Sequence, residues 1–193
     1  VLYKCLKMQK RYSVVFHPTS EVIATIKAMK DFLKSKINWY NSCNSVAHIT
    51  ICEIEINESQ LENFKKKLAK ICDAFTPFMV HLNDFGAYEN SGAFFIKPNK
   101  ESKDSLKPIM KKIQETLKPL KIKSDDPHIS IGRRLTPENL EIASQLFTTI
   151  DVEFLCDAII LREFDPKVKQ FFVIETIPFG SNPEPEFIQA SLF

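Results

Sequence analysis

The stretch VAHITICEIEI, residues 46–56, contains a histidine and a threonine among apolar residues. Its β-branched residues favour a strand, and alternate side chains of a strand point to the same face. His48 and Thr50 therefore face one way, while Ile49 and Ile51 face the other way, into packing. The stretch predicts a half-buried strand that presents an imidazole and a hydroxyl about 7 Å apart on one face.

A second stretch, PHISI at residues 127–131, repeats that pattern 80 residues further along the chain. Each copy follows a proline at the same interval, because Pro18 to His48 and Pro98 to His128 are both 30 residues. Long internal periods usually indicate solenoids, but two copies indicate a duplicated lobe. Two such lobes facing each other would bring one histidine strand from each into a shared cleft.

Hydrophobic spacing predicts the same order of elements in each half of the chain: strand, proline, helix, histidine strand, capped helix and strand. The expected helices occupy residues 21–36, 57–75, 99–117 and 136–147. The expected strands occupy residues 11–16, 46–56, 78–88, 92–98, 127–135, 151–164 and 170–177. We expect the last two strands to form a hairpin.

These elements predict an α+β fold of two pseudo-symmetric lobes, each an antiparallel-rich sheet with helices on its outer face, around a central cleft. We expect the bilobal domain to span residues 11–177, with repeat halves of about 11–90 and 91–177. Residues 1–10 are interpreted as an N-terminal extension, and the proline-rich residues 178–193 as a C-terminal tail.

Composition limits the functional classes to which the chain can belong. A chain of 193 residues with 44% hydrophobic and 26% charged residues is long enough to bury a substantial core. Its net charge of +2 argues against a protein that coats duplexes, and its four glycines include no glycine-rich phosphate loop. Five scattered cysteines favour a reducing, cytoplasmic setting. No apolar run could span a membrane, so we expect no membrane partner. We also expect a monomer.

The paired motifs suit phosphate chemistry. Two imidazoles that face each other across a phosphodiester provide a general base and a general acid near neutral pH. The hydroxyls of Thr50 and Ser130 can bind the phosphate oxygens, together with a cation from Arg133 or Arg134. The chain has no H-E-x-x-H motif, closely spaced histidine pair or Cys/His cluster. We therefore predict a metal-independent reaction without a cofactor.

The HIT and HIS motifs, their separation and the doubled strand-helix pattern resemble the two-histidine phosphoesterase superfamily, above all its 2'-5' RNA ligase-like and cyclic phosphodiesterase members. The resemblance covers about residues 11–177. It implies that His48 and His128 are the catalytic acid and base. It also implies that Thr50 and Ser130 bind the phosphate of the substrate.

The sequence leaves open which arginine faces the substrate. Some members of the superfamily that the chain resembles carry an arginine shortly after the second motif, a position that Arg133 matches. Strict alternation along the strand from His128 instead favours Arg134, unless Gly132 permits a bulge that changes the parity. Which histidine is the acid and which is the base is open as well.

The predicted function is that of a phosphoesterase acting on 2',3'-cyclic phosphates or 2'-5' phosphodiester bonds. The expected substrate is a phosphate at an RNA end or on a nucleotide. Two alternatives use the same residues. One is a module that binds a nucleotide or an RNA end without turnover, and the other is a 2'-5' RNA ligase that runs the chemistry in reverse.

Other polar and aromatic residues carry weaker expectations. His17 is interpreted as a strand terminus, exposed or hydrogen-bonded, and His81 as structural because it points to the other face of its strand. Tyr88, Phe94 and Trp39 are candidates for stacking on a base. The lysine runs lie on helices with apolar stripes and are interpreted as solvated faces.

Overall fold

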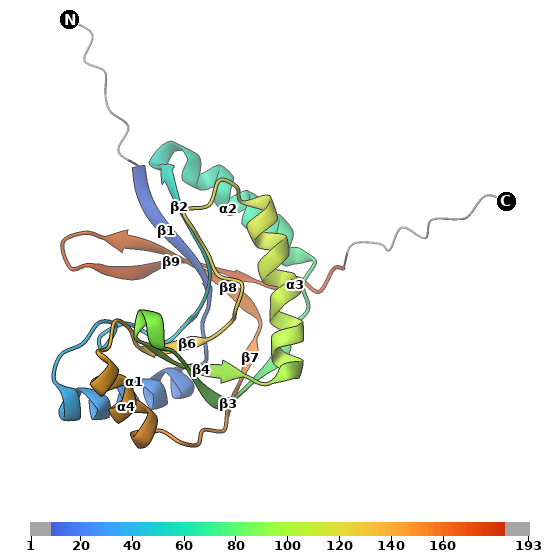
Figure 1. Cartoon of the computed structure of the whole chain (residues 1–193). Helices are drawn as coiled ribbons and strands as arrows, with labels where there is room; N and C mark the ends of the chain where they lie inside the picture. Colours follow the sequence, from blue (N-terminus) through green and yellow to red (C-terminus); the bar gives the residue numbers. More distant parts are fainter. Residues whose placement is uncertain (1–8, 184–193) are drawn as a thin grey trace, which may run out of the picture.

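The computed structural model describes residues 9–183 of the chain. Most of the predicted extension (1–10) and most of the predicted tail (178–193) therefore lie outside the described residues. In this part of the chain the strands form one curved, antiparallel sheet, and four α-helices pack against it (Figure 1). The predicted α+β class is confirmed.

The strands follow one another across the sheet in the order β7-β3-β4-β6-β2-β1-β8-β9, and β5 pairs with β2. Their bounds are β1 Gln9–Phe16, β2 Ile49–Asn57, β3 Phe78–Tyr88, β4 Ala93–Pro98, β5 Ile122–Lys123, β6 Ile129–Gly132, β7 Val152–Cys156, β8 Ala158–Asp165 and β9 Gln170–Pro178. The two predicted sheets are thus joined into one. The joint is a single antiparallel residue pair, Ile49 with Ile129, between β2 and β6.

The helices are α1 Ser20–Ile37, α2 Glu58–Asp73, α3 Lys100–Thr116 and α4 Pro137–Leu146, and a short 3₁₀ turn covers Glu89–Ser91. Their starts follow from local chemistry. The Asn57 backbone N–H donates to the Gln60 side chain at 3.0 Å before α2. Before α4, the Thr136 hydroxyl accepts from the Asn139 N–H at 3.2 Å, and Pro137 begins the helix.

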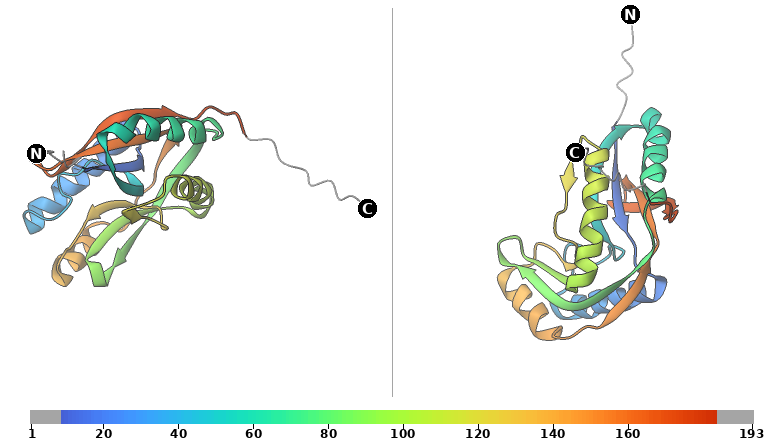
Figure 2. Two further views of the ribbon diagram at one scale, coloured as in Figure 1. Left: turned by 90° about the horizontal axis from the view of Figure 1, so that it is seen from above. Right: turned by 90° about the vertical axis from the view of Figure 1, so that its right-hand side faces the viewer.

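The helices pack against the sheet in two pairs (Figure 2). In one pair, α2 contacts β2 and β9, while α3 crosses the joint and contacts β2, β3 and β4. The other pair, α1 and α4, contacts β6 and β4. Ile49 and Ile129 are fully buried in the common core, whereas the histidine and the hydroxyl residue that flank each of them are half-buried, as expected for strands with one covered face.

The joint between β6 and β2 divides the sheet into two groups of strands, β7-β3-β4-β6 and β2-β1-β8-β9. These groups do not coincide with the two repeat halves of the sequence. Strand β3 belongs to the first half but pairs with β4 and β7, and β8 and β9 belong to the second half but continue the sheet from β1. Each half therefore gives strands to the other group. The predicted hairpin of 151–164 with 170–177 is split for the same reason, because β7 and β8 lie in different groups and only β8 pairs with β9.

The repeat is visible in the strand register. The partners in β1–β2 are Val14–Cys52, Val15–Thr50 and Phe16–Ile49, and those in β4–β6 are Phe94–Gly132, Phe95–Ser130 and Ile96–Ile129. Every residue of the second set lies 80 positions after its counterpart in the first. Each histidine strand also contains one unpaired extra residue, Ile51 or Ile131, which is a β-bulge.

Two further findings concern features noted in the sequence. The four described cysteines, Cys43, Cys52, Cys72 and Cys156, are buried and free. Among the helices within residues 9–183, none combines the length and apolar character needed to cross a bilayer.

Candidate functional site

The pairing of β2 with β6, at the residues that follow the two histidines, determines the site. The register puts His48 opposite Ser130. By the same register, Thr50 lies opposite His128. Opposed residues of an antiparallel ladder share one face, and their diagonal neighbours lie about 7–8 Å apart. The two histidines are such diagonal neighbours, so their side chains lie next to each other on the same face. We call the side of the sheet that carries these four side chains the histidine face.

The two imidazoles are held in the same way. Nδ1 of His48 lies 2.6 Å from the Val46 carbonyl oxygen, and Nδ1 of His128 lies 2.8 Å from the Asp126 carbonyl oxygen. A carbonyl oxygen only accepts, so Nδ1 carries the proton in both rings and Nε2 of the neutral ring keeps its lone pair. Within residues 9–183 neither Nε2 has a hydrogen-bond partner, and both are therefore available to a ligand.

Burial sets the protonation of both rings. Burial, and next the positive charge of Arg162, hold the pKa of His48 well below its ordinary value. Burial also lowers the pKa of His128, against the opposing effects of the Asp126 carbonyl and carboxylate. Both rings are therefore neutral near pH 7 when no anion is bound. The hydroxyls of Thr50 and Ser130 make no hydrogen bond to any described residue.

The bulges change which side chains follow each motif on the histidine face. Cys52 is fully buried, and a Cβ added to Gly132 would meet the Leu135 side chain at 2.7 Å, so both positions face the core. The next residues, Glu53 and Arg133, therefore lie on the histidine face. Arg133 lies on the same face as His128 because Ile131 is an extra residue without a partner in β4.

The sequence left open whether Arg133 or Arg134 lies near His128, and the bulge distinguishes between them. The Arg133 backbone N–H donates to the Asn41 carbonyl at 3.2 Å. After burial, which is the main cause, its positive charge is among the effects that lower the pKa of His128. Arg134 follows the end of β6 with a φ of 54°. The strict alternation that favoured Arg134 does not hold beyond the bulge, and the structure puts Arg133 rather than Arg134 beside His128.

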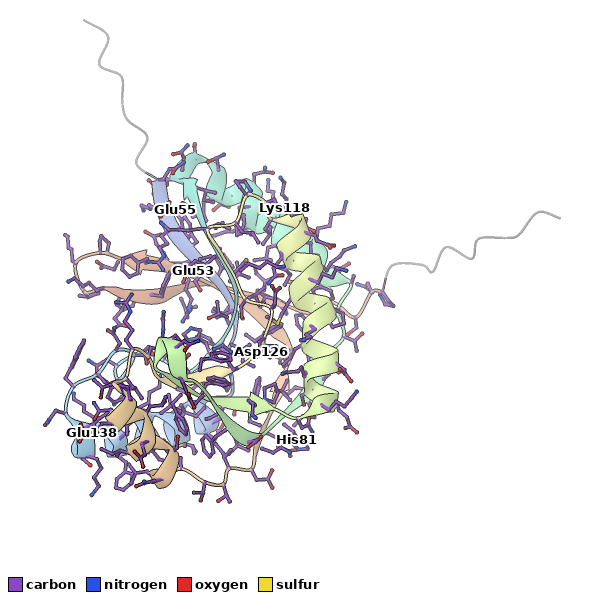
Figure 3. All side chains as sticks on the ribbon, in the orientation of Figure 1. Glu53, Glu55, His81, Lys118, Asp126 and Glu138 are labelled. Carbon is purple, nitrogen blue, oxygen red and sulfur yellow. The ribbon has the colours of Figure 1, made fainter. Side chains whose placement is uncertain are left out.

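An aromatic and acidic cluster surrounds His128. The Asp126 carboxylate accepts a hydrogen bond from the Tyr88 hydroxyl at 2.5 Å and pairs with the Lys103 ammonium at 2.7 Å. The ring centroid of Phe95 lies 4.6 Å from that of His128, and the Tyr88 centroid lies 6.1 Å from it. Figure 3 shows Asp126 in the segment that leads into β6, close to α3. The hydrogen bond to Asp126 raises the pKa of Tyr88 to about 12.

A buried arginine lies on the His48 side. Arg162 of β8 pairs with Ser13 of β1, and its Nη2 donates to the Ser13 hydroxyl at 3.0 Å. The arginine is only 4% exposed, and its Nε is buried without a partner among the described residues. His17 follows the residue that pairs with Ile49, so it lies opposite His48. Burial, and then Arg162, lower the pKa of His17 to about 4.

Sequence reasoning missed Arg162, Asp126 and Phe95. A single charged residue inside the apolar run AIILREF was a usable signal for Arg162, because an arginine is rarely buried without a reason. Asp126 and Phe95 carried no comparable signal. Their position depends on which segments become neighbours in the sheet.

The other expectations have mixed outcomes. Phe94 is 2% exposed and stacks on Phe85 in the core, so it is not available to stack on a base. Tyr88 is 43% exposed beside His128, whereas Trp39 is 67% exposed and contributes no contact to the histidine face described above. His81 pairs with the Glu153 carboxylate across β3 and β7, and β4 separates these strands from β6 (Figure 3).

Neither the cavity beside α3 nor any acidic cluster of the described residues forms a competing site of the same kind. A cavity of about 420 Å³ lies between α3 and the segment before β6, with Lys107, Lys118 and Lys123 in its wall. None of the four motif side chains lines it. In the described part of the chain, no three His, Cys, Asp or Glu side chains are grouped so that they could hold a metal ion.

Comparison with known proteins points to one family. The model of the family described as the 2'-5' RNA ligase superfamily matches residues 18–167. No curated protein matches the chain in sequence. Similar solved structures include E. coli LigT complexed with 3'-AMP, at a TM-score of 0.65 and 11% identity over 89% of this chain and 99% of that chain.

Two further structures show the same fold. TT0787 of Thermus thermophilus has a TM-score of 0.55 and 17% identity, over 88% of this chain and 98% of its own. Usb1 of Kluyveromyces marxianus has a TM-score of 0.56 and 12% identity, over 88% of this chain and 98% of its own. Nearly the whole length of each relative is therefore represented in the described fold.

Proposed function

This chain belongs to the 2'-5' RNA ligase superfamily, and on that premise we propose that it hydrolyses 2',3'-cyclic phosphates or 2'-5' phosphodiester bonds at RNA ends or on nucleotides. The observation that supports the proposal most is the single residue pair between β2 and β6. It brings two imidazoles and two hydroxyls from segments 80 residues apart onto one face. The resemblance that the paired motifs carry in the sequence is confirmed at the level of the family.

In the proposed reaction the phosphate of the substrate lies between the two rings. The neutral ring takes a proton from water at its Nε2, and the water oxygen forms a bond to phosphorus. The bond from phosphorus to a ribose oxygen breaks, and the protonated ring donates a proton to that leaving oxygen. Thr50 and Ser130 would donate hydrogen bonds to the non-bridging oxygens, and Arg133 would offset their charge. We propose that no metal ion takes part.

A nucleotide-sized anion is the substrate class that the comparisons support. E. coli LigT, whose fold this chain shares, has been solved with phosphate and with 3'-AMP. Both ligands carry a phosphate of the kind that two imidazoles and two hydroxyls can surround. Since both histidine strands come from one chain, a monomer contains the whole proposed site. The four buried, free thiols support a reducing, cytoplasmic setting.

The test is hydrolysis of 2',3'-cyclic AMP, followed by separation of the ring-opened monophosphate. We expect His48→Ala and His128→Ala each to lower turnover by about 10²–10⁴-fold, which is the usual contribution of a proton-transfer group. His81→Ala is the matched control, since its ring lies away from the histidine face, and it should keep full activity. Circular dichroism should show the same fold in all three variants, and excess EDTA should leave the wild-type rate unchanged.

Each other outcome has a defined meaning. Full activity in either histidine variant would remove that ring from the mechanism. Loss of activity with EDTA that a divalent ion restores would contradict a metal-independent reaction. Tight binding of the cyclic nucleotide without ring opening would indicate a binding module, and joining of RNA ends would indicate a ligase.

A further inference from the structure

The two histidines occupy equivalent positions in the repeat, yet the groups beside them differ in charge. Ser13 pairs with Arg162 in β1–β8, and its counterpart Ala93 pairs with Tyr88 in β4–β3. Arg162 and Tyr88 are therefore equivalent positions in the two groups of strands. One is a buried cation and the other is a neutral phenol bonded to a carboxylate. The symmetry of the backbone is thus broken by its side chains.

The charged side chains that most affect the pKa of His48 are basic. Arg162 from β8 is buried and forms no ion pair with any described residue, although the negative charge of Glu53 acts on it. Lys30 from α1 is 1% exposed and donates to the backbone and hydroxyl oxygens of Ser45 at 2.8 and 2.9 Å. His17 from the end of β1 lies opposite. After burial, the charges of Arg162, Lys30 and His17 all lower the pKa of His48, and only the Val46 carbonyl opposes them.

The surroundings of His128 include an acid. After burial, the Asp126 carbonyl and carboxylate are the next largest effects on the pKa of His128, and both raise it. Arg133 and Lys103 lower it, although the Lys103 ammonium is itself paired with Asp126 at 2.7 Å. The carboxylate therefore partly compensates the burial of this ring. His48 has no such compensation.

We propose that Arg162 and Asp126 are positioning residues that divide the roles of the two histidines: Arg162 keeps His48 unprotonated, as the base, and Asp126 favours the protonated form of His128, as the acid. In hydrolysis, Nε2 of His48 then accepts the proton of the attacking water. Nε2 of His128 donates its proton to the leaving ribose oxygen, while its Nδ1–H stays bonded to the Asp126 carbonyl. This assignment of roles rests on the proposed function, whereas the difference between the two rings does not.

The assignment also orients the substrate. The leaving ribose must lie on the His128 side, next to Phe95 and the exposed ring of Tyr88. The base that this ribose carries can stack on Tyr88, and the attacking water approaches from the His48 side. A nucleoside with its base on the leaving-group side, such as a nucleoside 2',3'-cyclic phosphate, has this arrangement.

The experiment is an NMR titration of the two imidazoles in the full chain, without substrate. In the wild type we expect His48 to titrate at a lower pH than His128. Arg162→Met should raise the His48 midpoint by about one unit or more, because removing a nearby cation stabilises the imidazolium. Asp126→Asn should lower the His128 midpoint. Lys36→Met is the matched control, since Lys36 is also a cation that stacks over an aromatic ring, Phe32, but its charge is not among those that act on His48 or His128. It should move neither midpoint.

The activity profile gives a second readout. Arg162→Met should move the acidic limb of the rate to higher pH, and Asp126→Asn should move the alkaline limb to lower pH. A His128 midpoint below that of His48, or an unchanged His48 midpoint in Arg162→Met, overturns the proposal. Should Arg162→Met fail to fold, Arg162→Lys must keep the wild-type His48 midpoint and Asp126→Asn still decides. If the chain hydrolyses no cyclic phosphate but shows these shifts, the proposed function is wrong, while the difference between the two histidines stands.

Discussion

Single side chains determine which charge reaches the proposed phosphate position. Arg133 lies beside His128 because the strand has an extra residue before it, and Gly132 turns toward Leu135 where a side chain would have no room. Arg134, the next residue, continues in a left-handed conformation after β6 ends. Two adjacent arginines of identical chemistry are therefore expected to differ in function.

Replacement of each arginine tests this difference. Arg133→Met should lower kcat/KM for 2',3'-cyclic AMP by about 10–100-fold, because a hydrogen bond to a charged group contributes about 1.5–3 kcal/mol. Arg134→Met should stay within about twofold of the wild type. Thermal melts of both variants control for stability. Equal losses in the two variants would show that the bulge does not select between them.

At the scale of elements, one helix side chain connects β2 to the segment that precedes β6. The amide of Gln114, in α3, donates to the Ile51 carbonyl at 2.9 Å and to the Ser124 carbonyl at 2.7 Å. Ile51 is the bulge residue of β2, and Ser124 precedes the segment that leads to His128. Gln114 is 4% exposed, so water does not replace these bonds readily. The helix therefore supports both sides of the site at once.

Gln114→Ala should lower the free energy of unfolding by about 1–3 kcal/mol, because the Ser124 carbonyl would lose its side-chain donor and the Ile51 carbonyl would keep only the Ser124 N–H. Gln145→Ala is the control, since Gln145 is an exposed helical residue that bonds only to Glu141 of its own helix. It should change the free energy of unfolding by less than about 0.5 kcal/mol. Urea denaturation of both variants measures the difference. Similar losses in both would show that the buried bonds contribute nothing specific.

At the scale of the whole molecule, the two repeat halves depend on each other. Strand β3 has all its strand partners in the second half of the chain, and β1 has β8 as one neighbour. Separation of the halves would leave long unpaired strand edges and expose core residues such as Leu82 and Ile159, which are fully buried. The repeat therefore describes how the sequence is organised, while the folding unit extends over both halves.

Fragments test this interdependence. Residues 9–90 and 91–183, produced separately, should each lack a cooperative thermal transition in circular dichroism. Mixed in equal amounts, they should regain the sheet signal, and the intact chain should unfold in one transition. A cooperative melt from either fragment alone would show that a single half forms a stable lobe.

The sequence alone predicted most of the elements, the α+β class, the 80-residue repeat, the paired histidine motifs and, through them, the family. Each of these depends on spacing along one segment, such as the alternation of His48 and Thr50 with buried isoleucines. The three-dimensional structure was needed to show that Arg133 rather than Arg134 lies beside His128, since a bulge is defined by the partner strand. It alone brought Arg162 to His48 and Tyr88 to His128, and it exchanged strands between the halves. The reason is physical: these features depend on pairing between distant segments, which local periodicity does not encode.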